Sequence, residues 1–101
     1  MPEASTGAGV FASIQMPTTI YDGQVTLTAV AQALSATSVP IKSVTIENPI
    51  TNAVVYMGNS NATVASYRIQ PGATASMDID DLSKVYVLGT VDEIISFFAV
   101  N

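Results

Sequence analysis

The chain has 101 residues, of which 49% are apolar and only 11% are charged, and its formal net charge is −5. It contains no Cys, so no disulfide can reinforce the fold. Its three cations, Lys42, Arg68 and Lys84, are too few and too scattered to bind a nucleic acid or an anionic membrane surface, so neither partner is expected.

A length near 100 residues fits a single domain, and no apolar run approaches the ~20 residues of a membrane span. The low share of charged residues is more informative, because soluble domains carry about 25%. A surface with so few charges is better suited to contact with copies of the chain or with a partner than to bare exposure in water. The composition therefore favours a component of an assembly over a free enzyme.

Residues 1–9 contain neither Lys nor Arg nor an apolar core, so they do not have the pattern of a signal peptide. Small residues and glycines bury too little surface to offset the entropy of ordering. We expect residues 1–9 to form a flexible N-terminal arm and residues 10–101 to form the folded domain.

Apolar residues recur at every second position in four segments, a pattern typical of strands with one face toward a core. These segments are residues 10–16, 25–30, 43–47 and 75–80. The first alternates from Val10 to Met16, and Pro17 ends it. Residues 28–38 are Ala-rich and also match helical spacing. We interpret them as a strand that ends near Ala29, followed by an irregular segment.

Two further segments, residues 53–57 and 85–88, are apolar at consecutive positions, which indicates strands that are buried on both faces. In a domain of this size, we expect another subunit to provide the second cover. The segments VVYMG at 54–58 and KVYVLG at 84–89 are also similar to each other. This similarity predicts that they are paired inner strands of one sheet.

Dipeptides typical of turns separate the predicted strands. Asp22-Gly23 predicts a tight turn, and Pro71-Gly72 has the residues of a type II turn. Turns at intervals of about 8–12 residues are typical of a sandwich or barrel. The predicted fold is an all-β, single-domain antiparallel β-sandwich with a jelly-roll-like topology and a flexible N-terminal arm.

The chain has no His and no Cys, so it lacks the most common general acid–base residue and the strongest side-chain nucleophile. The adjacent residues Ser83 and Lys84 would point to opposite faces of a strand and would not meet. We therefore predict that the protein is not an enzyme, with no catalytic residues, no cofactor-binding residues and no cofactor.

The densest carboxylates are Asp78, Asp80 and Asp81. They could ligate a hard cation such as Ca²⁺. Alternatively they form a solvated strand end, with Asp81 capping a short helical turn over residues 80–83 before a strand that starts at Val85. The spacing does not match an EF-hand, which favours the second interpretation, so no metal-binding residue is predicted.

Aromatic residues are the main candidates for binding. Four tyrosines could form a platform for sugar rings, although tyrosines at alternating strand positions more often lie at the edge of a core or an interface. These tyrosines are Tyr21, Tyr56, Tyr67 and Tyr86. The adjacent Phe97 and Phe98 must point to opposite faces, one toward the core and the other toward an intersubunit contact. The predicted interface residues are Tyr56, Tyr86, Phe97, Phe98, Val10 and Phe11.

Four segments carry a resemblance to a known family: ATSVPIKSVTI at 36–46, VYMGNS at 55–60, YRIQPG at 67–72 and IDDLSKVYV at 79–87. Through them, residues 25–100 resemble a small virion protein of tailed bacteriophages, of the capsid decoration (cement) or head accessory type. The resemblance covers about three quarters of the chain, and its motifs are structural rather than catalytic. It implies a compact β-sandwich, often trimeric, that binds a capsid lattice.

The expected function is therefore that of a non-enzymatic virion structural protein, made in the bacterial host cytoplasm and located on the capsid surface. As a homotrimer it would bind the major capsid protein and stabilise the assembled capsid. Two alternatives remain: a receptor- or glycan-binding module of a phage tail or fibre, and a head–tail adaptor subunit.

Overall fold

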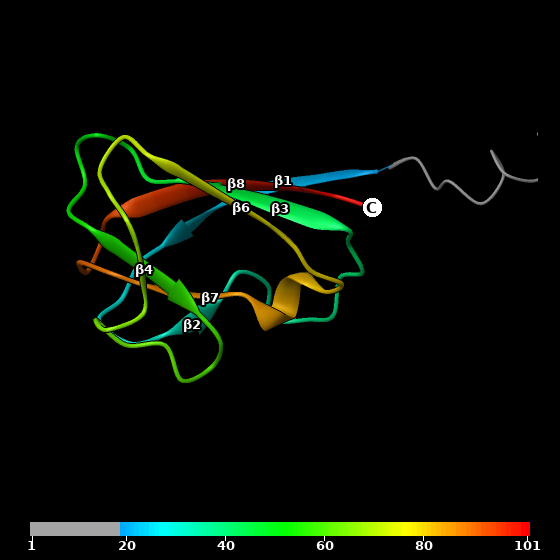
Figure 1. Cartoon of the computed structure of the whole chain (residues 1–101), viewed down its shortest axis with the longest axis horizontal. Helices are drawn as coiled ribbons and strands as arrows, with labels where there is room; N and C mark the ends of the chain where they lie inside the picture. The colour runs from blue at the N-terminus through cyan, green and yellow to red at the C-terminus, as the bar shows by residue number, and fades with distance from the viewer. Residues whose placement is uncertain (1–18) are drawn as a thin grey trace, which may run out of the picture.

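The computed structural model describes residues 19–101, which form eight strands and one short 3-10 helix (Figure 1). The strands are β1 (Ile20–Thr26), β2 (Gln32–Ala33), β3 (Ser43–Glu47), β4 (Val55–Gly58), β5 (Tyr67–Ile69), β6 (Thr74–Asp78), β7 (Tyr86–Leu88) and β8 (Ile94–Val100). The 3-10 helix, η1, spans Leu82–Lys84. Among these residues no helix is long and apolar enough to cross a membrane.

The strands form two antiparallel sheets of four strands each. Sheet A has the order β1-β8-β3-β6, and sheet B has the order β2-β7-β4-β5. The first strand pairs with the last, β2 with β7, β3 with β6 and β4 with β5, as in one long hairpin that has been rolled up. This is the arrangement of a jelly roll, so the predicted all-β sandwich is confirmed.

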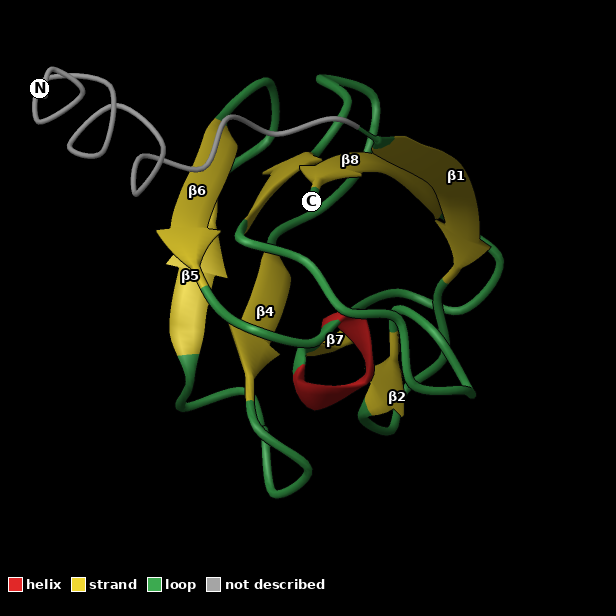
Figure 2. Cartoon of the chain, turned by 90° about the vertical axis from the view of Figure 1, so that its right-hand side faces the viewer, coloured by secondary structure: helices red, strands yellow, loops and turns green. Residues whose placement is uncertain are grey.

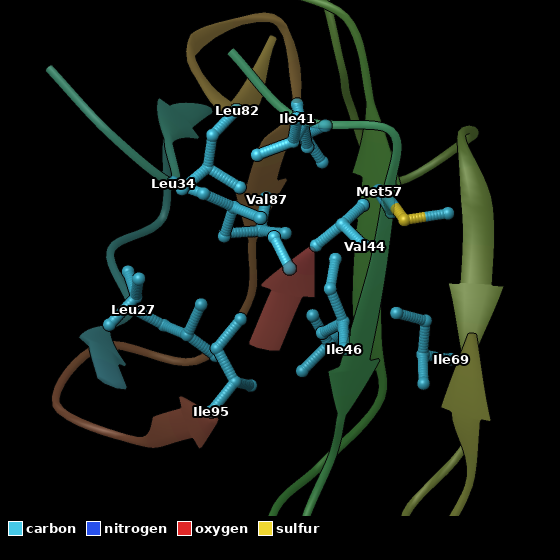
Figure 3. Packing of buried hydrophobic residues seen from close by; sticks show 14 residues of the cluster. Leu27, Leu34, Ile41, Val44, Ile46, Met57, Ile69, Leu82, Val87 and Ile95 are labelled. Atoms are coloured by element: carbon cyan, nitrogen blue, oxygen red, sulfur yellow. The ribbon is translucent and has the colours of Figure 1, made fainter. Parts of the chain in front are cut away.

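The core lies between the two sheets (Figure 3). Alternation along the strands supplies it, because every second residue of β3 and β8 points inward. The buried apolar residues that form this core cluster are Val25, Leu27, Leu34, Ile41, Val44, Ile46, Val55, Met57, Ile69, Leu82, Val85, Val87, Ile95 and Ala99. The alternation predicted for residues 43–47 is therefore confirmed.

The turn predicted at Asp22-Gly23 is wrong, because both residues lie inside β1. Gly23 is paired with Phe97 of β8, and a β-carbon at Gly23 would lie 3.2 Å from the Phe97 ring. The glycine thus makes room for an aromatic side chain across the sheet rather than reversing the chain. The turn predicted at Pro71-Gly72 is confirmed by the positive φ of +80° at Gly72.

The strand predicted to continue to Ala29 ends earlier, at Thr26, and no helix forms in residues 28–38. The chain bends after the fully buried Leu27, where the Thr28 hydroxyl donates to the Val30 carbonyl at 2.9 Å. It then crosses to sheet B as the two-residue strand β2. The local hydroxyl–carbonyl bond competes with the sheet ladder and helps to end the strand.

The two similar segments of the sequence are the inner strands of sheet B. β4 pairs with β7, with Tyr56 opposite Leu88 and Gly58 opposite Tyr86. The expectation of paired inner strands is confirmed. Outward-pointing Leu88 is nonetheless only 4% exposed, because loops of the same chain lie over it. For Leu88, the expectation that another subunit supplies the second cover is therefore corrected.

The described chain starts and ends at one corner of sheet A. The Thr19 amide donates to the Asn101 carbonyl at 3.4 Å, and the Asn101 amide donates to the Thr19 carbonyl at 2.9 Å. The predicted flexible arm over residues 1–9, the predicted strand over residues 10–16, and the predicted interface residues Val10 and Phe11 lie outside the described residues.

Candidate functional site

Within the acidic segment, residues 78–81, the carboxylate of Asp81 forms several hydrogen bonds inside the fold. Asp81 is the N-cap of η1: its carboxylate accepts from the Ser83 amide at 2.9 Å and from the Ser83 hydroxyl at 2.8 Å. The same carboxylate accepts from the Val39 amide at 3.0 Å and from the Ser38 hydroxyl. The helical turn and its Asp81 cap, both expected from the sequence, are confirmed.

These bonds also set the electrostatics of the segment. The Ser38 hydroxyl, followed by the Ser83 amide and hydroxyl and the Val39 amide, holds the pKa of Asp81 far below its usual value. Lys84 donates to Asp80 at 2.8 Å, and this hydrogen bond raises the pKa of Lys84. Both Asp81 oxygens thus have protein partners, and the interpretation as a capped strand end describes Asp81 better than that of a cation ligand.

No group of three or more His, Cys, Asp or Glu side chains in residues 19–101 is arranged to hold a metal ion. Asp78 and Asp80 border a shallow groove at the end of β6, together with Lys42 and Ser43 of the β3 side. The Ser83 hydroxyl binds Asp81 while the Lys84 ammonium binds Asp80, so this adjacent Ser and Lys engage different carboxylates.

The tyrosines do not converge on one platform. Tyr56 and Tyr86 lie on neighbouring strands of sheet B and share its outer face, where Arg68 is directly opposite Tyr56. Tyr67 is exposed on the edge strand β5, and Tyr21 packs against the core from β1. A sugar-binding surface made by all four side chains is therefore not formed in one subunit.

Phe97 and Phe98 point to opposite faces of sheet A, as adjacent residues of a strand must. Phe97 packs against the core, whereas Phe98 points outward from sheet A and is 49% exposed. Of the predicted interface residues, Phe98 thus lies on the outer face of one sheet and Tyr56 and Tyr86 on the outer face of the other. One flat interface could not include both Phe98 and the two tyrosines, because these side chains lie on opposite outer faces of the sandwich.

Phe98 lies on the outer face of sheet A, where further apolar side chains of β1 and β8 are exposed. The outward positions along β8 are Ile94, Ser96, Phe98 and Val100, so Ser96 lies between Ile94 and Phe98. The register places Ile20 of β1 beside Val100 and Asp22 of β1 beside Phe98. Ile20 is 72% exposed and Ile94 is 43% exposed. We call Ile20, Ile94, Phe98 and Val100 the β8 patch. Exposed apolar patches of this kind mark surfaces that contact other proteins.

The surroundings of the β8 patch are mostly uncharged. On the far side of β8, Thr45 of β3 lies opposite Phe98, and its hydroxyl is 2.8 Å from that of Ser76 on β6. The four strands of sheet A carry no Lys or Arg, and their outward acids are Asp22, Glu47 and Asp78. The charged residues that usually protect a solvated sheet are therefore sparse here.

A second apolar feature lies over sheet B. Loops 29–31 and 60–64 border a groove whose floor is Leu88. Val30 and Val64 on its two rims are 70% and 64% exposed. Alternation does not single out these valines, because it assigns residues to strand faces and gives no information on which loops remain uncovered. It does not single out Ile20 and Ile94 either, because both lie at strand ends, where the sequence gives no information on the covering elements.

The comparisons with known proteins are sparse: no family model and no curated protein matches the chain. A solved structure described as Bacillus endospore appendages, a family of disulfide-linked pili, is 16% identical, covering 81% of this chain and 88% of that chain with a TM-score of 0.43. The coat protein of Tobacco streak virus is 9% identical, covering 88% and 90% with a TM-score of 0.32. One is a pilus and the other a virus coat, and both likenesses are too distant to assign this chain a function.

Proposed function

We propose that the chain is a non-enzymatic structural protein of a virion, which binds the assembled capsid as a homo-oligomer and stabilises it. The β8 patch is the observation that carries this proposal. It combines exposed Ile20, Ile94 and Phe98 with a hydroxyl-rich surround on a face without Lys or Arg. Such a surface is suited to contact with protein rather than to a solvated or catalytic role.

Decoration of a capsid needs no chemistry from the bound protein. A subunit that binds the assembled lattice but not the free capsid protein stabilises the lattice by mass action. Several linked copies multiply weak contacts through avidity, so a modest patch on each subunit is sufficient. A homotrimer on the capsid surface is the form that we propose, consistent with the resemblance to small virion proteins of tailed phages.

The test combines self-association with capsid binding. We expect the wild-type chain to sediment as an oligomer at micromolar concentration and to co-sediment with capsids that lack it, but not with free capsid protein. Capsids carrying the protein should withstand heating better than bare capsids. A 10.5 kDa monomer that binds no capsid would overturn the proposal.

Specific binding on a glycan array, without capsid binding, would instead support a receptor-binding module. Ring symmetry other than threefold in particle images would support an adaptor subunit. These two outcomes separate the proposed function from its alternatives.

A further inference from the structure

The strand β6 forms an edge of sheet A (Figure 2), and its outer backbone groups are open to a further strand. β6 pairs with β3 through alternate residues: the Ala73 carbonyl accepts from the Asn48 amide at 3.0 Å, and the Ile79 amide donates to the Lys42 carbonyl at 3.2 Å. By the alternation of an antiparallel ladder, the amides and carbonyls of Thr74, Ser76 and Asp78 point away from β3. Within residues 19–101 no other strand pairs with them.

The side chains on the inner face of β6 are also incompletely covered. Ala75 and Met77 point toward the core but are only partly buried, and the same holds for Ile79 just beyond the strand. By contrast, the corresponding inward residues of β3, Val44 and Ile46, are 2% and 0% exposed. A strand added beside β6 could therefore satisfy backbone groups and bury apolar side chains at once.

The sequence offers one segment of matching character, residues 10–16. Val10, Ala12, Ile14 and Met16 alternate with Phe11, Ser13 and Gln15, which is the pattern of a strand with one apolar face. Seven residues are enough to cover the five residues of β6. Pro17 follows, and a residue that precedes proline prefers an extended backbone.

Residues 10–16 cannot all pair with β6 of their own subunit. β1 and β6 are separated by β8 and β3, so a strand outside β6 would lie four strand spacings from β1, about 19 Å. The chain from Ile20 back to Met16 spans at most ~14 Å when fully extended.

Pairing with the outer edge of the subunit's own β1 would need a reversal at Pro17-Thr18-Thr19. That link contains none of the Gly, Asn or Asp residues that tight hairpins prefer. An extended link would instead place residues 10–16 beyond their own sheet, within reach of another molecule.

We propose that residues 10–16 of one subunit add as an extra strand to the free edge of β6 in a second copy of the chain. The contact is heterologous, because donor segment and acceptor edge are different surfaces, so each subunit gives one strand and receives one. A closed ring of subunits satisfies every edge. The inference rests on the proposed function, since it specifies how the structural subunits join to one another.

Complementary variants of the full chain test this directly. Ser76→Pro removes an amide that faces the free edge, and Ser76→Ala is its control, because both lose the hydroxyl contact with Thr45. Ile14→Asp places a charge on the apolar face of the donor segment, and Ser13→Asp adds the same charge to its polar face. Sedimentation velocity then measures assembly, and circular dichroism with thermal unfolding checks the fold.

We expect Ser76→Pro and Ile14→Asp to need at least about tenfold higher concentration than their controls to assemble. Mixed together, the two variants should form a 1:1 heterodimer, because one keeps a functional segment and the other a functional edge. If both variants assemble like their controls, or if folded variants do not combine on mixing, strand addition is wrong. The proposed function would survive that result as long as the wild type still binds capsids.

A second measurement does not depend on proline at β6. The chain has no Cys, so single cysteines act as unique reporters. Chains with Ser13→Cys and chains with Ser76→Cys place both thiols on the outer face of the proposed sheet, and when mixed and oxidised they should give a disulfide-linked heterodimer. Pairing with the subunit's own β1 would instead cross-link Ser13→Cys with Gln24→Cys inside one chain, since Gln24 also points outward, and that result would overturn the proposal.

Discussion

Gly23 of β1 lies directly opposite Phe97 of β8, and the Phe97 ring occupies the space that a side chain at Gly23 would fill. A β-carbon there would be 3.2 Å from two ring atoms, Cε1 and Cζ. We predict that Gly23→Val destabilises the fold by roughly 1–3 kcal/mol, because overpacking forces the ring or the strand to move. Urea unfolding monitored by circular dichroism measures the change.

The double variant Gly23→Val with Phe97→Leu separates this clash from a general cost of valine in β1. A smaller side chain at 97 should make Gly23→Val less destabilising than it is in the wild-type background. Equal effects in both backgrounds would show that the ring does not limit position 23.

Asn48 is the one fully buried polar residue among those described, and it links the loop before β4 to the end of β5. Its side-chain amide donates to the Ala53 and Ile69 carbonyls, both at 2.9 Å. We predict that Asn48→Ala lowers the free energy of unfolding by about 2–4 kcal/mol, since two carbonyls lose their donor in a buried site. The exposed substitution Asn61→Ala is the control and should stay within ~0.5 kcal/mol in the same urea titration.

The hydrogen bonds to Asp81 predict a dependence of stability on pH. Because they depress the pKa of Asp81 in the folded protein, its stabilising contribution is complete above the unfolded pKa of about 3.9. That contribution is lost as the pH falls below this value toward the folded pKa. The stability difference between wild type and Asp81→Asn should therefore be large at neutral pH and shrink in strong acid.

Unfolding by urea at several pH values measures this difference. Asp22→Asn, which removes the same charge from an exposed position of β1, is the control and should show a smaller effect at neutral pH. An Asp81→Asn effect that is independent of pH would contradict the assignment of these bonds to the ionised carboxylate.

Phe98 is predicted to contribute to binding but not to folding. Replacing this outward side chain with Ser should leave the unfolding free energy almost unchanged, because the core contact of this strand is made by Phe97. It should weaken capsid binding by roughly 30-fold, as expected for an aromatic residue at the centre of an interface. Ile50→Ser is the matched control, since Ile50 is 79% exposed but lies in a loop outside the β8 patch. Equal binding by both variants would show that the patch is not the contact.

Alternation in the sequence predicts the strands β3 and β6, which pair with each other in regular antiparallel register. Val44 and Ile46 in β3 follow the period of two and are buried. The cap at Asp81 was also predictable, because an N-cap bonds residues close to it in sequence.

Other features depend on partners that are distant in sequence. Asp22-Gly23 has the composition of a turn, yet its conformation is set by Phe97 on the opposite strand. The cover over Leu88 comes from loops whose course no local pattern specifies. The β8 patch was only partly foreseen: Phe98 was predicted from its adjacency to Phe97, but the register that places Ile20 beside Val100 is a property of the assembled sheet.

The hydrogen bonds between Thr19 and Asn101 have a practical consequence for labelling the protein. A fluorescent or affinity tag fused after Asn101 would sit beside Thr19, and its bulk would obstruct the donor segment that we propose. The loop that contains Thr51 lies at the far end of sheet A, where Asn52 donates to the Ile94 carbonyl at 2.8 Å. A short epitope inserted beside Thr51 would allow the protein to be detected without blocking the corner formed by Thr19 and Asn101.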